Sequence, residues 1–455
     1  MRTDSWTPPF RRLLVANRGE IAIRVIRACR ELGISPIAVH SDADADSLHV
    51  RGADRSERIG PAPAGESYLS TAAILEAARS SGAEAIHPGY GFLSENAAFA
   101  RAVEDAGLVF VGPSPSVLKA LGNKLEARRS AAAAGVSIVP GTTVALEDDV
   151  GAVEEIGYPV MLKAAAGGGG RGMRRVDDAG QLSEAMAAAR REAASAFGDS
   201  TIYVERLVAP ARHVEVQLLG DRHGGLAVLG ERDCSVQRRN QKLVEESPSP
   251  AVDATTRKAL FESARRVART VDFHNAATVE FLLDRNGDHY FLEMNTRLQV
   301  EHGVTELVTG LDLVVWQIRV AAGERLPPEV LDAPRSGHAI EVRLYAEDPF
   351  DGFRPTSGRV TAWRMPEGPG VRVDAGMAEE TDLRPEYDPL LAKLMVHAVD
   401  RPSAIGRLRR ALDETLIGGL QTDAGFLRWL VDDDAFAGGR YDTSIIPERW
   451  GSGPE

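Results

Sequence analysis

An Asn286-Gly287 turn between two apolar, strand-like runs constrains the fold of this chain more than any other feature. Both residues tolerate a positive φ angle, so the pair favours a tight β-hairpin with a loop of about two or four residues centred on it. In that hairpin Glu280 lies directly opposite Glu293. Like charges that face each other on a sheet are destabilising, so we expect a positive group between the two carboxylates.

The end of the hairpin carries the ligand types of a magnesium site. Mg²⁺ binds carboxylate oxygens together with the phosphate oxygens of a substrate. Asn295 stands one strand step beyond Glu293 and adds an amide oxygen to the carboxylates of Glu280 and Glu293. The sequence therefore predicts a metal–nucleotide site at these residues.

An alternating polar segment follows the hairpin directly. Arg297, Gln299 and Glu301 alternate with apolar residues and would share one face of an extended segment. A solvated edge strand is the simpler interpretation of such an alternation taken alone. Beside a carboxylate pair, we favour the interpretation that a cation, an amide and a carboxylate converge next to the metal.

Composition is typical of a soluble globular α/β protein with two or three domains. The chain has 455 residues, 44% of them hydrophobic, and a formal net charge of −13. This charge argues against a general nucleic-acid or membrane-surface binder, so local cations would hold an anionic substrate. No apolar run has the length of a signal peptide or a membrane span, which predicts a cytoplasmic protein. Cys29 and Cys234 support neither a disulfide framework nor a zinc site, and we expect both to be packing residues.

Lysine is rare, with six among the 53 basic residues. A compact ammonium binds phosphate as a point charge, so a lysine in an arginine-rich chain marks a candidate phosphate site. Lys163 is the strongest candidate, because it ends a strand-like run and precedes the glycine-rich residues 164–173. Backbone N–H groups of such a loop could fold over phosphates. The loop lacks the Gly-Lys-Ser/Thr of a Walker P-loop, so a plain linker stays the alternative.

The N-terminal segment reads as a βαβ unit. Residues 11–16 and 37–40 have the apolar character of buried strands, and residues 19–30 have that of a helix. The first turn has only Gly19, which disfavours the dinucleotide fingerprint and NAD. A strand at Ala85-Ile86 leads into residues 87–96, a loop for which small-molecule contacts and a structural turn are equally good interpretations.

The middle of the chain predicts a small lid and several further strands. Residues 135–210 are rich in Gly and Ala and include a helical run at 181–194, while a strand at 201–204 leads into a hinge at 205–208 whose backbone could bind a purine edge. Residues 212–218 alternate like a half-buried strand. Residues 231–242 look too charged for a core, and a solvated loop is their simplest interpretation. Residues 326–336 look like a junction to a mostly β region.

Six segments, in this order, closely resemble biotin carboxylase, a member of the ATP-grasp superfamily, from about Arg11 to about Arg449. They are Ala16–Ala22, His87–Asn96, the glycine loop after Lys163, Arg232–Arg239, Glu293–His302 and Ile340–Asp348. The resemblance implies an α/β fold with an N-terminal Rossmann-like (pre-ATP-grasp) domain at 10–122 and an ATP-grasp domain at 123–327. The latter would include a small mobile lid at about 136–210, and a mainly β C-terminal domain would follow at 335–449.

The resemblance also implies functions for individual residues. The implied ATP-binding residues are Lys124, Lys163, Gly169, Gly170, Glu205, Arg206, Leu207, Val208, His213, Gln237 and Asn240. The implied ligands of two divalent ions, Mg²⁺ or Mn²⁺, are Glu280, Glu293 and Asn295, in agreement with the hairpin argument. The implied bicarbonate-binding residues are Lys242, Arg297, Gln299, Val300 and Glu301, and the implied biotin-binding residues are Arg343 and Tyr90.

The implied reaction is ATP- and bicarbonate-dependent carboxylation of biotin through carboxyphosphate, with release of ADP and phosphate. Lys242, Arg297, Glu301 and Arg343 would be the catalytic residues. Glu301 would act as general base on bicarbonate, while Lys242 and Arg297 neutralise charge. Arg343 would stabilise the ureido oxyanion of biotin.

Relatives that carry their own biotin attach it to a lysine set between methionines, and no lysine of this chain follows a methionine. We therefore expect biotin on a separate biotin carboxyl carrier protein. A carboxyltransferase subunit and a homodimer are further expectations, whereas nucleic acid and membrane are not expected partners. The transferase would choose the final acceptor, so acetyl-CoA, propionyl-CoA, pyruvate and a role in fatty acid biosynthesis stay open.

Asn240 departs from the family pattern, because members often carry His at this nucleotide contact. Asn can donate a hydrogen bond but cannot carry a positive charge, which makes it the weakest predicted ATP contact. Two other functions are alternatives: an ATP-grasp carboxylase of a free acceptor such as urea, and a non-catalytic nucleotide-binding module. Intact Lys163, Glu293, Arg297 and Glu301 argue against the module.

Overall fold

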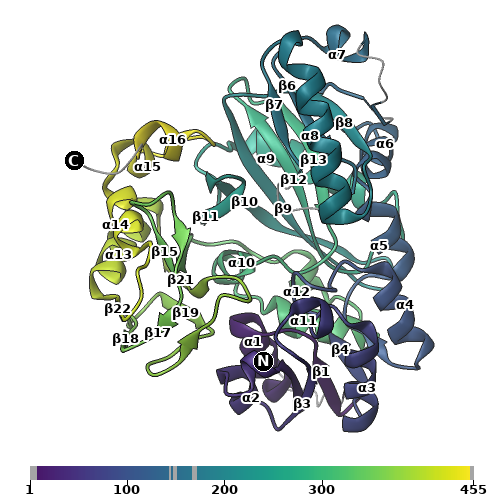
Figure 1. The fold of residues 1–455 in the computed structure, drawn as a ribbon, viewed down its shortest axis with the longest axis vertical. Helices are drawn as coiled ribbons and strands as arrows, with labels where there is room; N and C mark the ends of the chain where they lie inside the picture. Colours follow the sequence, from purple (N-terminus) through teal and green to yellow (C-terminus); the bar gives the residue numbers. More distant parts are fainter. Residues whose placement is uncertain (1–7, 143–144, 147–150, 167–171, 451–455) are drawn as a thin grey trace.

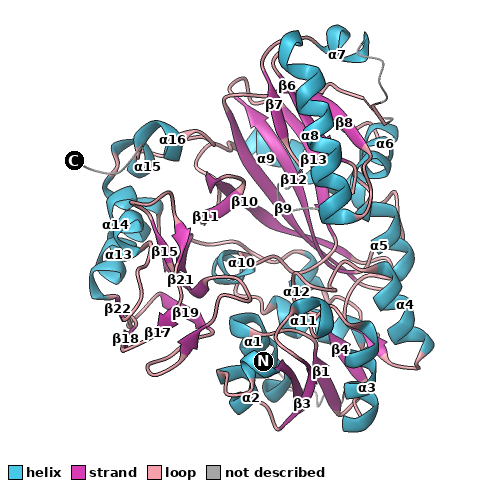
Figure 2. Ribbon diagram, in the orientation of Figure 1, coloured by secondary structure: helices cyan, strands magenta, loops and turns pink. Residues whose placement is uncertain are grey.

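The structure of the chain, a computed structural model, describes residues 8–142, 145–146, 151–166 and 172–450. Figure 1 shows an N-terminal unit, a central region built around a long sheet with a small unit at its far end, and a C-terminal region beside that sheet. Helices and strands are mixed along the chain, as Figure 2 shows, which agrees with the predicted α/β class. Gly169 and Gly170 lie outside the described residues.

The N-terminal unit is a five-stranded parallel sheet in the order β3-β2-β1-β4-β5, and it confirms the predicted βαβ start. Helix caps match the sequence: Ser70 caps α3, and Ser114 with Pro115 at the first helical position begins α5. The elements are β1 Arg12–Val15, α1 Gly19–Glu31, β2 Ser35–Ser41, η1 Asp42–Asp44, α2 Leu48–Gly52, β3 Arg55–Gly60, η2 Ala64–Glu66, α3 Thr71–Ser81, β4 Ala85–His87, α4 Ala97–Asp105, β5 Val109–Phe110 and α5 Pro115–Gly122.

The strand order of this unit reverses direction between β1 and β4. In open parallel sheets, ligand-binding loops gather at such a switch point, beyond the carboxyl ends of the strands. Here Asn17 ties the two loops together, because its Nδ2 donates to the backbone oxygens of Pro88 and Tyr90, each at 2.7 Å. The loops therefore hold Glu20 and Tyr90 at one edge of the sheet.

An antiparallel sheet of eight strands, in the order β13-β12-β9-β10-β11-β14-β21-β19, forms the centre of the molecule. Its last three strands belong to the C-terminal region, so the central and C-terminal regions share one sheet. The central elements are α6 Lys124–Ala133, β9 Ala211–Gly220, β10 Leu226–Arg238, β11 Gln241–Ser247, α9 Ala254–Ala268, β12 Asn275–Asp284, β13 His289–Asn295, α10 His302–Thr309, α11 Leu313–Ala321 and α12 Pro328–Leu331.

The predicted hairpin is β12 and β13, and a β-bulge separates two registers in it. Next to the turn, Phe281 pairs with Phe291 and Leu283 with His289, one residue out of step with a loop centred on Asn286-Gly287. Beyond the bulge between Glu280 and Phe281, the predicted register is restored. Glu280 pairs with Glu293, and Gly287 in the connecting loop has a φ of +86°. The loop is closed by Asp284, whose backbone N–H donates to the oxygen of Asp288 at 2.9 Å.

Strand β9 is buried on both faces, whereas the alternation of residues 212–218 predicted a half-buried strand. Apolar side chains of β9 and β12 pack against α9 on one face, including Val214 and Val279 against Leu260. The other face carries polar residues such as Glu215 and Gln217, which are also buried. The alternation was read correctly, but the polar face lies inside the protein.

The predicted lid region contains a small sheet of its own, in the order β7-β6-β8, at the top of Figure 1. Helix α8 packs on this sheet, and Leu162, Met186 and Val204 belong to a separate hydrophobic core there. The elements are α7 Gly151–Ile156, β6 Val160–Ala164, β7 Arg174–Val176, α8 Ala179–Phe197 and β8 Ile202–Arg206.

The C-terminal region contributes many short strands, as predicted, together with helices that cover one face of the shared sheet. Ile340 and Leu394 on strands pack against Leu408 and Phe426 on helices. The elements are β14 His338–Tyr345, β15 Glu347–Asp348, β16 Arg354–Pro355, β17 Gly358–Arg359, β18 Ala362–Arg364, β19 Val371–Ala375, β20 Asp382–Leu383, β21 Leu390–Ala398, α13 Arg401–Glu414, β22 Leu416–Gly418, α14 Ala424–Asp432, α15 Asp434–Ala437 and α16 Ile445–Arg449. Among the residues described, none of the helices is both long and apolar enough to span a membrane.

Candidate active site

One face of the central sheet carries a row of ionisable side chains that crosses four strands. Glu280 on β12 pairs with Glu293 on one side and with Glu215 on the other, and Glu215 pairs with Arg232 on β10. Residues paired across antiparallel strands point to the same face. The carboxylate pair predicted from the hairpin is therefore extended by a third carboxylate, Glu215, which is fully buried.

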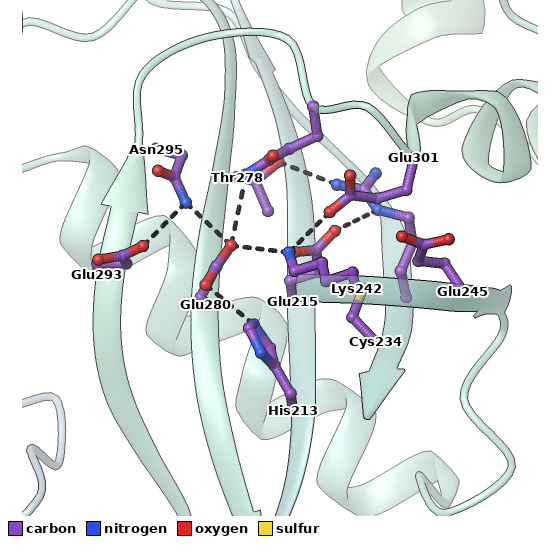
Figure 3. Close-up of polar contacts among 12 residues, drawn as sticks. His213, Glu215, Cys234, Lys242, Glu245, Thr278, Glu280, Glu293, Asn295 and Glu301 are labelled. Atoms are coloured by element: carbon purple, nitrogen blue, oxygen red, sulfur yellow. Dashed lines mark hydrogen bonds and ion pairs between the residues drawn. The ribbon is translucent and has the colours of Figure 1, made fainter. Parts of the chain in front are cut away.

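Lys242 on β11 supplies the positive group that the carboxylates require. Its Nζ lies 2.6 Å from Glu215 Oε2, 3.0 Å from Glu280 Oε1 and 2.7 Å from Glu301 Oε1, as Figure 3 shows. An ammonium has three N–H donors, so each carboxylate takes one. Burial alone would lower the pKa of Lys242, but the three glutamates outweigh it and hold that pKa well above its usual value.

Glu301 connects Lys242 with Arg343 on β14. Its Oε2 lies 3.0 Å from Arg343 Nη2, and it is the residue that immediately precedes α10, where the helix dipole favours a carboxylate. Burial would raise the pKa of Glu301, but Lys242, Arg343 and Arg232 hold it well below its usual value. The carboxylate is therefore ionised at neutral pH and lies between the residues predicted for bicarbonate and for biotin.

The three predicted metal ligands lie together at the end of the hairpin. Asn295 Nδ2 donates to Glu280 Oε1 at 2.9 Å and to Glu293 Oε1 at 3.4 Å, and the Lys124 ammonium contacts the other oxygen of Glu293. Two carboxylates and an amide oxygen are a donor set that suits Mg²⁺. The residues present therefore fit a divalent ion held with phosphate oxygens.

Two other groups of side chains on this face have ligand atoms close enough to share an ion: His213, Glu215 and Glu280, and Glu215, Cys234 and Glu301. Both groups contain carboxylates that already contact the Lys242 ammonium. A divalent cation at either position would be repelled by that charge. Glu280 and Glu293 of the hairpin set also contact ammonium groups, those of Lys242 and Lys124, so this repulsion does not choose between the sets. Glu280, Glu293 and Asn295 are the better ligand set because they alone offer only oxygen ligands, which Mg²⁺ prefers.

The two lysines predicted to bind ATP lie near each other at the base of the small unit. The Lys124 N–H donates to the oxygen of Ala165 at 3.0 Å, beside the glycine loop, and Lys163 Nζ lies 2.5 Å from Glu205 Oε2. Burial and the neighbouring Lys163 lower the pKa of Lys124 to about 8. The negative charge of a bound phosphate group would offset the repulsion between the two ammonium groups. Two adjacent lysines are therefore suited to bind the phosphates of a nucleotide.

The segment predicted as a hinge, residues 205–208, begins inside strand β8. The N–H of Arg206 donates to Pro140 O at 2.7 Å, and that of Leu207 donates to Pro159 O at 3.0 Å. A purine edge would therefore have to use other backbone groups of the segment. Glu205 is buried, and its carboxylate contacts Arg128 as well as Lys163.

The segment from Arg297 to Glu301 has a bend at Arg297 and a turn that leads into α10, so it is not the edge strand that was the simpler interpretation. The side chains still converge. Arg297 Nη1 donates to Gln299 Oε1 at 2.8 Å, Gln299 Nε2 donates to Glu280 Oε1 at 3.4 Å, and Arg297 Nε donates to Glu95 Oε2 at 2.9 Å. The helix start, rather than strand periodicity, brings the polar groups to one side.

Comparison with known proteins gives the family of this site. Residues 9–118 match the model described as "Biotin carboxylase, N-terminal domain", residues 123–329 that of "Carbamoyl-phosphate synthase L chain, ATP binding domain", and residues 341–448 that of "Biotin carboxylase C-terminal domain". Biotin carboxylase of Halalkalibacterium halodurans is 49% identical over 440 residues, which cover 96% of this chain and 97% of that protein. The chain belongs to the biotin carboxylase family. It is therefore an enzyme, as predicted.

Solved structures of biotin carboxylases share the fold over nearly the whole chain. The biotin carboxylase–β-γ-ATP complex from Campylobacter jejuni has a TM-score of 0.94 and 44% identity, covering 97% of this chain and 99% of that one. The biotin carboxylase domain dimer of the Hydrogenobacter thermophilus 2-oxoglutarate carboxylase, in complex with MgADP, ADP and bicarbonate, has a TM-score of 0.93 and 43% identity, covering 96% and 97%.

Within this biotin carboxylase fold, the charged run at residues 231–238 is a buried strand, which corrects its interpretation as a solvated loop. Arg232 is fully buried, with Nε 2.5 Å from Glu215 Oε1 and Nη1 donating to Gln217 Oε1 at 2.7 Å. Sequence reasoning therefore missed Arg232 and Glu215. A usable indication was present, because Glu215 stands two residues after His213 and so shares its face of the strand.

Tyr90, predicted to contact biotin, belongs to a chain of contacts that joins the N-terminal unit to the loop that contains Val300. Its hydroxyl donates to Glu20, Glu20 Oε2 lies 3.3 Å from Lys393 Nζ, and Lys393 donates to the backbone oxygen of Val300 at 2.8 Å. Burial and the Glu20 charge raise the pKa of Tyr90 well above its usual value. The hydroxyl therefore stays protonated and fixes the loop that contains Val300.

His213 and Gln237 lie beside the carboxylate row. His213 Nε2 is 2.9 Å from Glu280 Oε2, and Gln237 Nε2 is 2.7 Å from His213 Nδ1.

Cys234 is buried in the same region, and burial raises the pKa of its thiol well above the usual value. This environment is that of a packing residue, because a reactive cysteine requires an accessible thiolate.

Asn240 occupies a backbone conformation that favours Asn at this position of the chain. Arg239 and Asn240 form the loop between β10 and β11, with φ angles of +48° and +67°. Two successive residues with positive φ make the tight hairpin turn in which Asn is favoured. The residue is exposed, so its backbone role in the turn is separate from any contact of its amide with a nucleotide.

Replacement of Asn240 by Gly separates these two roles, because Gly keeps the turn and removes the amide. We expect Asn240→Gly to raise the KM for ATP about 2- to 10-fold, the effect of one neutral hydrogen bond, with kcat unchanged. Steady-state kinetics with varied ATP would measure this, and thermal unfolding would confirm that the turn is intact. An unchanged KM for ATP would show that Asn240 contributes to the turn and that its amide does not contact the nucleotide.

Proposed function

We propose that this chain catalyses the ATP- and bicarbonate-dependent carboxylation of biotin through carboxyphosphate, with release of ADP and phosphate. One observation carries the proposal: Glu301 contacts both Lys242 and Arg343 on the face of the sheet that also holds Glu280. Lys242 and Glu301 therefore connect the residues predicted to bind bicarbonate with Arg343, predicted to bind biotin, and with Glu280, predicted to bind the metal.

In the nucleotide half of the site, Lys124 and Lys163 bind the phosphates of ATP. Glu280, Glu293 and Asn295 would hold divalent ions, whose charge would offset the negative charge that develops on the transferred phosphoryl group. His213, Gln237, Asn240, residues 205–208 and the glycines at 169 and 170 complete the proposed ATP site.

In the bicarbonate half-reaction, Glu301 accepts the bicarbonate proton, and the resulting oxyanion attacks the γ-phosphorus of ATP. The bond between the γ-phosphorus and the β–γ bridging oxygen breaks, ADP leaves, and carboxyphosphate forms. Lys242 and Arg297 neutralise the two anions as they approach, while Gln299 and the backbone of Val300 orient the bicarbonate. The ionised state of Glu301 supports this assignment, since only a carboxylate can take the proton.

In the biotin half-reaction, carboxyphosphate divides into CO₂ and phosphate. The phosphate takes the proton from biotin N1′, and N1′ then attacks CO₂. Arg343 stabilises the negative charge on the ureido oxygen, and Tyr90 lies on the same side of the site. The Nε and Nη2 atoms of Arg343 contact the carboxylates of Glu245 and Glu301. The third nitrogen, Nη1, lies 3.5 Å from the Tyr345 hydroxyl, and in this proposal it donates to the ureido oxygen.

The substrate biotin is carried by a separate biotin carboxyl carrier protein, and a carboxyltransferase subunit takes the carboxyl group onward to an acyl-CoA or a related acceptor. A homodimer of this chain is also part of the proposal. We further propose the domain bounds 10–122, 123–327 and 335–449, with closure of the lid at 136–210 excluding water from carboxyphosphate.

The experiment that tests this function is ADP release from MgATP, first with and without bicarbonate and then with free biotin or a biotinylated carrier protein. We expect turnover to require bicarbonate and to rise when biotin is added. Bicarbonate-dependent turnover that rises with urea and not with biotin would instead identify a free-acceptor carboxylase. ATP binding without turnover under any condition would identify a non-catalytic module.

Replacement of Arg343 by Ala should affect mainly the biotin half-reaction. We expect the biotin-dependent rate to fall about 10²–10³-fold, as when one oxyanion donor is removed, with less than about a tenfold change in the slow bicarbonate-dependent ADP release without biotin. Arg364→Ala, at an exposed position on β18, is the matched control. Normal biotin carboxylation by Arg343→Ala would show that its assigned role is wrong.

A further inference from the structure

A pair of buried glutamates lies behind the biotin arginine. Glu245 on β11 and Glu341 on β14 are directly opposite each other in the antiparallel ladder, and both are fully buried. The Cβ atoms of such a pair are about 4.5–5.5 Å apart and point to the same face. Two ionised carboxylates at this separation, away from water, cannot both keep their charge at low cost.

Three of the four carboxylate oxygens of the pair lack a hydrogen-bond partner among the described residues. Glu245 Oε1 accepts from Arg343 Nε at 2.7 Å and lies 2.5 Å from Arg343 Nη2. Within the described part of the chain, Glu245 Oε2 and both oxygens of Glu341 have no hydrogen-bond partner. Buried polar atoms are nearly always hydrogen-bonded. A single proton between Glu245 Oε2 and one Glu341 oxygen would give each of these two atoms a partner.

Among the residues that the structure describes, Glu341 has no ion pair or hydrogen-bond partner, although the charges of Lys393 and Arg343 act on it. Lys393, which is opposite Arg343 on β21, is engaged with Val300 O at 2.8 Å and with Glu20 at 3.3 Å. On the α10 side, Gly303 approaches so closely that a Cβ there would lie 3.3 Å from Glu341 Oε2 and would clash with Met395 Sδ. The carboxyl group is thus covered by a glycine backbone and a methionine.

Titratable and charged groups face the pair from five elements. They are Cys234 on β10, Lys242 on β11, Arg343 on β14, Lys393 on β21, and Glu301 at the start of α10. Burial raises the pKa of Glu341 well above its usual value; Lys393 and Arg343 oppose this rise, and Glu245 and Glu301 add to it. Burial likewise raises the pKa of Glu245 to about 7, although Arg343 opposes it.

We propose that Glu341 is a positioning residue for the biotin half-reaction: a neutral carboxylic acid that shares its proton with Glu245 and so fixes Glu245 on Arg343. The proposal rests on the assignment of Arg343 to biotin made above. The pair then carries one negative charge rather than two beside Arg343, which also contacts Glu301. Loss of the shared proton would make Glu245 and Glu341 repel each other and would displace Glu245 from the guanidinium.

Two variants of Glu341 test this. Glu341→Gln keeps the shape and an N–H donor for Glu245 but cannot ionise, whereas Glu341→Leu removes the donor. At neutral pH we expect kcat/KM for biotin to stay within about 3-fold of wild type in Glu341→Gln and to fall at least about 10-fold in Glu341→Leu. Bicarbonate-dependent ADP release without biotin should change less than about 3-fold in both.

The pH profile and infrared spectrum give readouts that a purely structural role would not move. Wild type should lose biotin-dependent activity above neutral pH as the pair loses its proton, and Glu341→Gln should keep its activity to higher pH. The infrared difference spectrum, wild type minus Glu341→Gln at pH 7, should contain the C=O band of a protonated carboxylic acid. An absent band, or pH profiles that coincide, would overturn the proposal.

The controls separate this inference from the function on which it rests. If wild type shows no biotin-dependent turnover, the proposed function itself fails. If wild type depends on biotin and Glu341→Gln is as impaired as Glu341→Leu, the shared proton is wrong while the function stands. Should Glu341→Leu fail to fold, the pH profile and spectrum of Glu341→Gln still decide the matter.

Discussion

Glu301→Gln is expected to lower bicarbonate- and biotin-dependent ATP turnover by about 10²–10⁴-fold, the usual contribution of a general base. The amide has nearly the shape of the carboxylate, but it can neither take the bicarbonate proton nor balance Lys242 and Arg343. Those two cations lie 2.7 Å and 3.0 Å from the Glu301 oxygens, so the substitution leaves them without their shared counter-ion.

MgATP binding should be almost unaffected by this substitution, because Lys124, Lys163 and Glu293 do not contact Glu301. Isothermal titration with MgATP and an ADP-release assay would measure the two quantities on the same preparation. Glu329→Gln, at an exposed position on α12, is the matched control. Unchanged turnover in Glu301→Gln would remove Glu301 from the mechanism.

Lys242→Met should cost about 3–5 kcal/mol of unfolding free energy near pH 8, the range found when one partner of a buried ion cluster is removed. Met fills the space of the lysine stem but leaves Glu215, Glu280 and Glu301 facing one another without the ammonium that each now contacts. Turnover should be lost as well, since the same ammonium neutralises bicarbonate in the proposed reaction.

The loss of unfolding free energy in Lys242→Met should depend on pH in one direction. In wild type, the raised pKa of Lys242 gives stability that is present below about pH 10.5, and the lowered pKa values of Glu280 and Glu301 give stability that is present above about pH 4.5. Without the ammonium, the carboxylates bind protons more readily when folded. The deficit of Lys242→Met should therefore shrink as the pH falls from 8 to 5.

Guanidinium unfolding of wild type and Lys242→Met at several pH values would measure this deficit. Lys258→Met, at an exposed position on α9, provides the control for the loss of a lysine without a buried partner. A deficit that is the same at pH 8 and pH 5 would mean that the three carboxylates do not depend on Lys242 for their charge.

The sequence by itself determined the features of this protein that depend on neighbouring residues. The Asn286-Gly287 turn indicated the hairpin of β12 and β13 and the pairing of Glu280 with Glu293, although the chain reaches that pairing only through a β-bulge between Glu280 and Phe281. Apolar patterning likewise predicted the βαβ start, and an alanine-rich run predicted helix α8. Ordered motifs along the chain were sufficient to indicate the family.

Only the tertiary structure decided how the charges are neutralised. Residues 231–238 read as solvated because a charged run is usually exposed, yet Arg232 is buried beside Glu215, which comes from another strand. The positive charge expected between the hairpin carboxylates comes from two lysines, because Lys242 on β11 contacts Glu280 and Lys124 contacts Glu293. Glu301 reaches Lys242 from the start of α10. A buried charge is tolerated only when partners from elsewhere surround it, and a linear pattern does not show which distant residues the fold brings together.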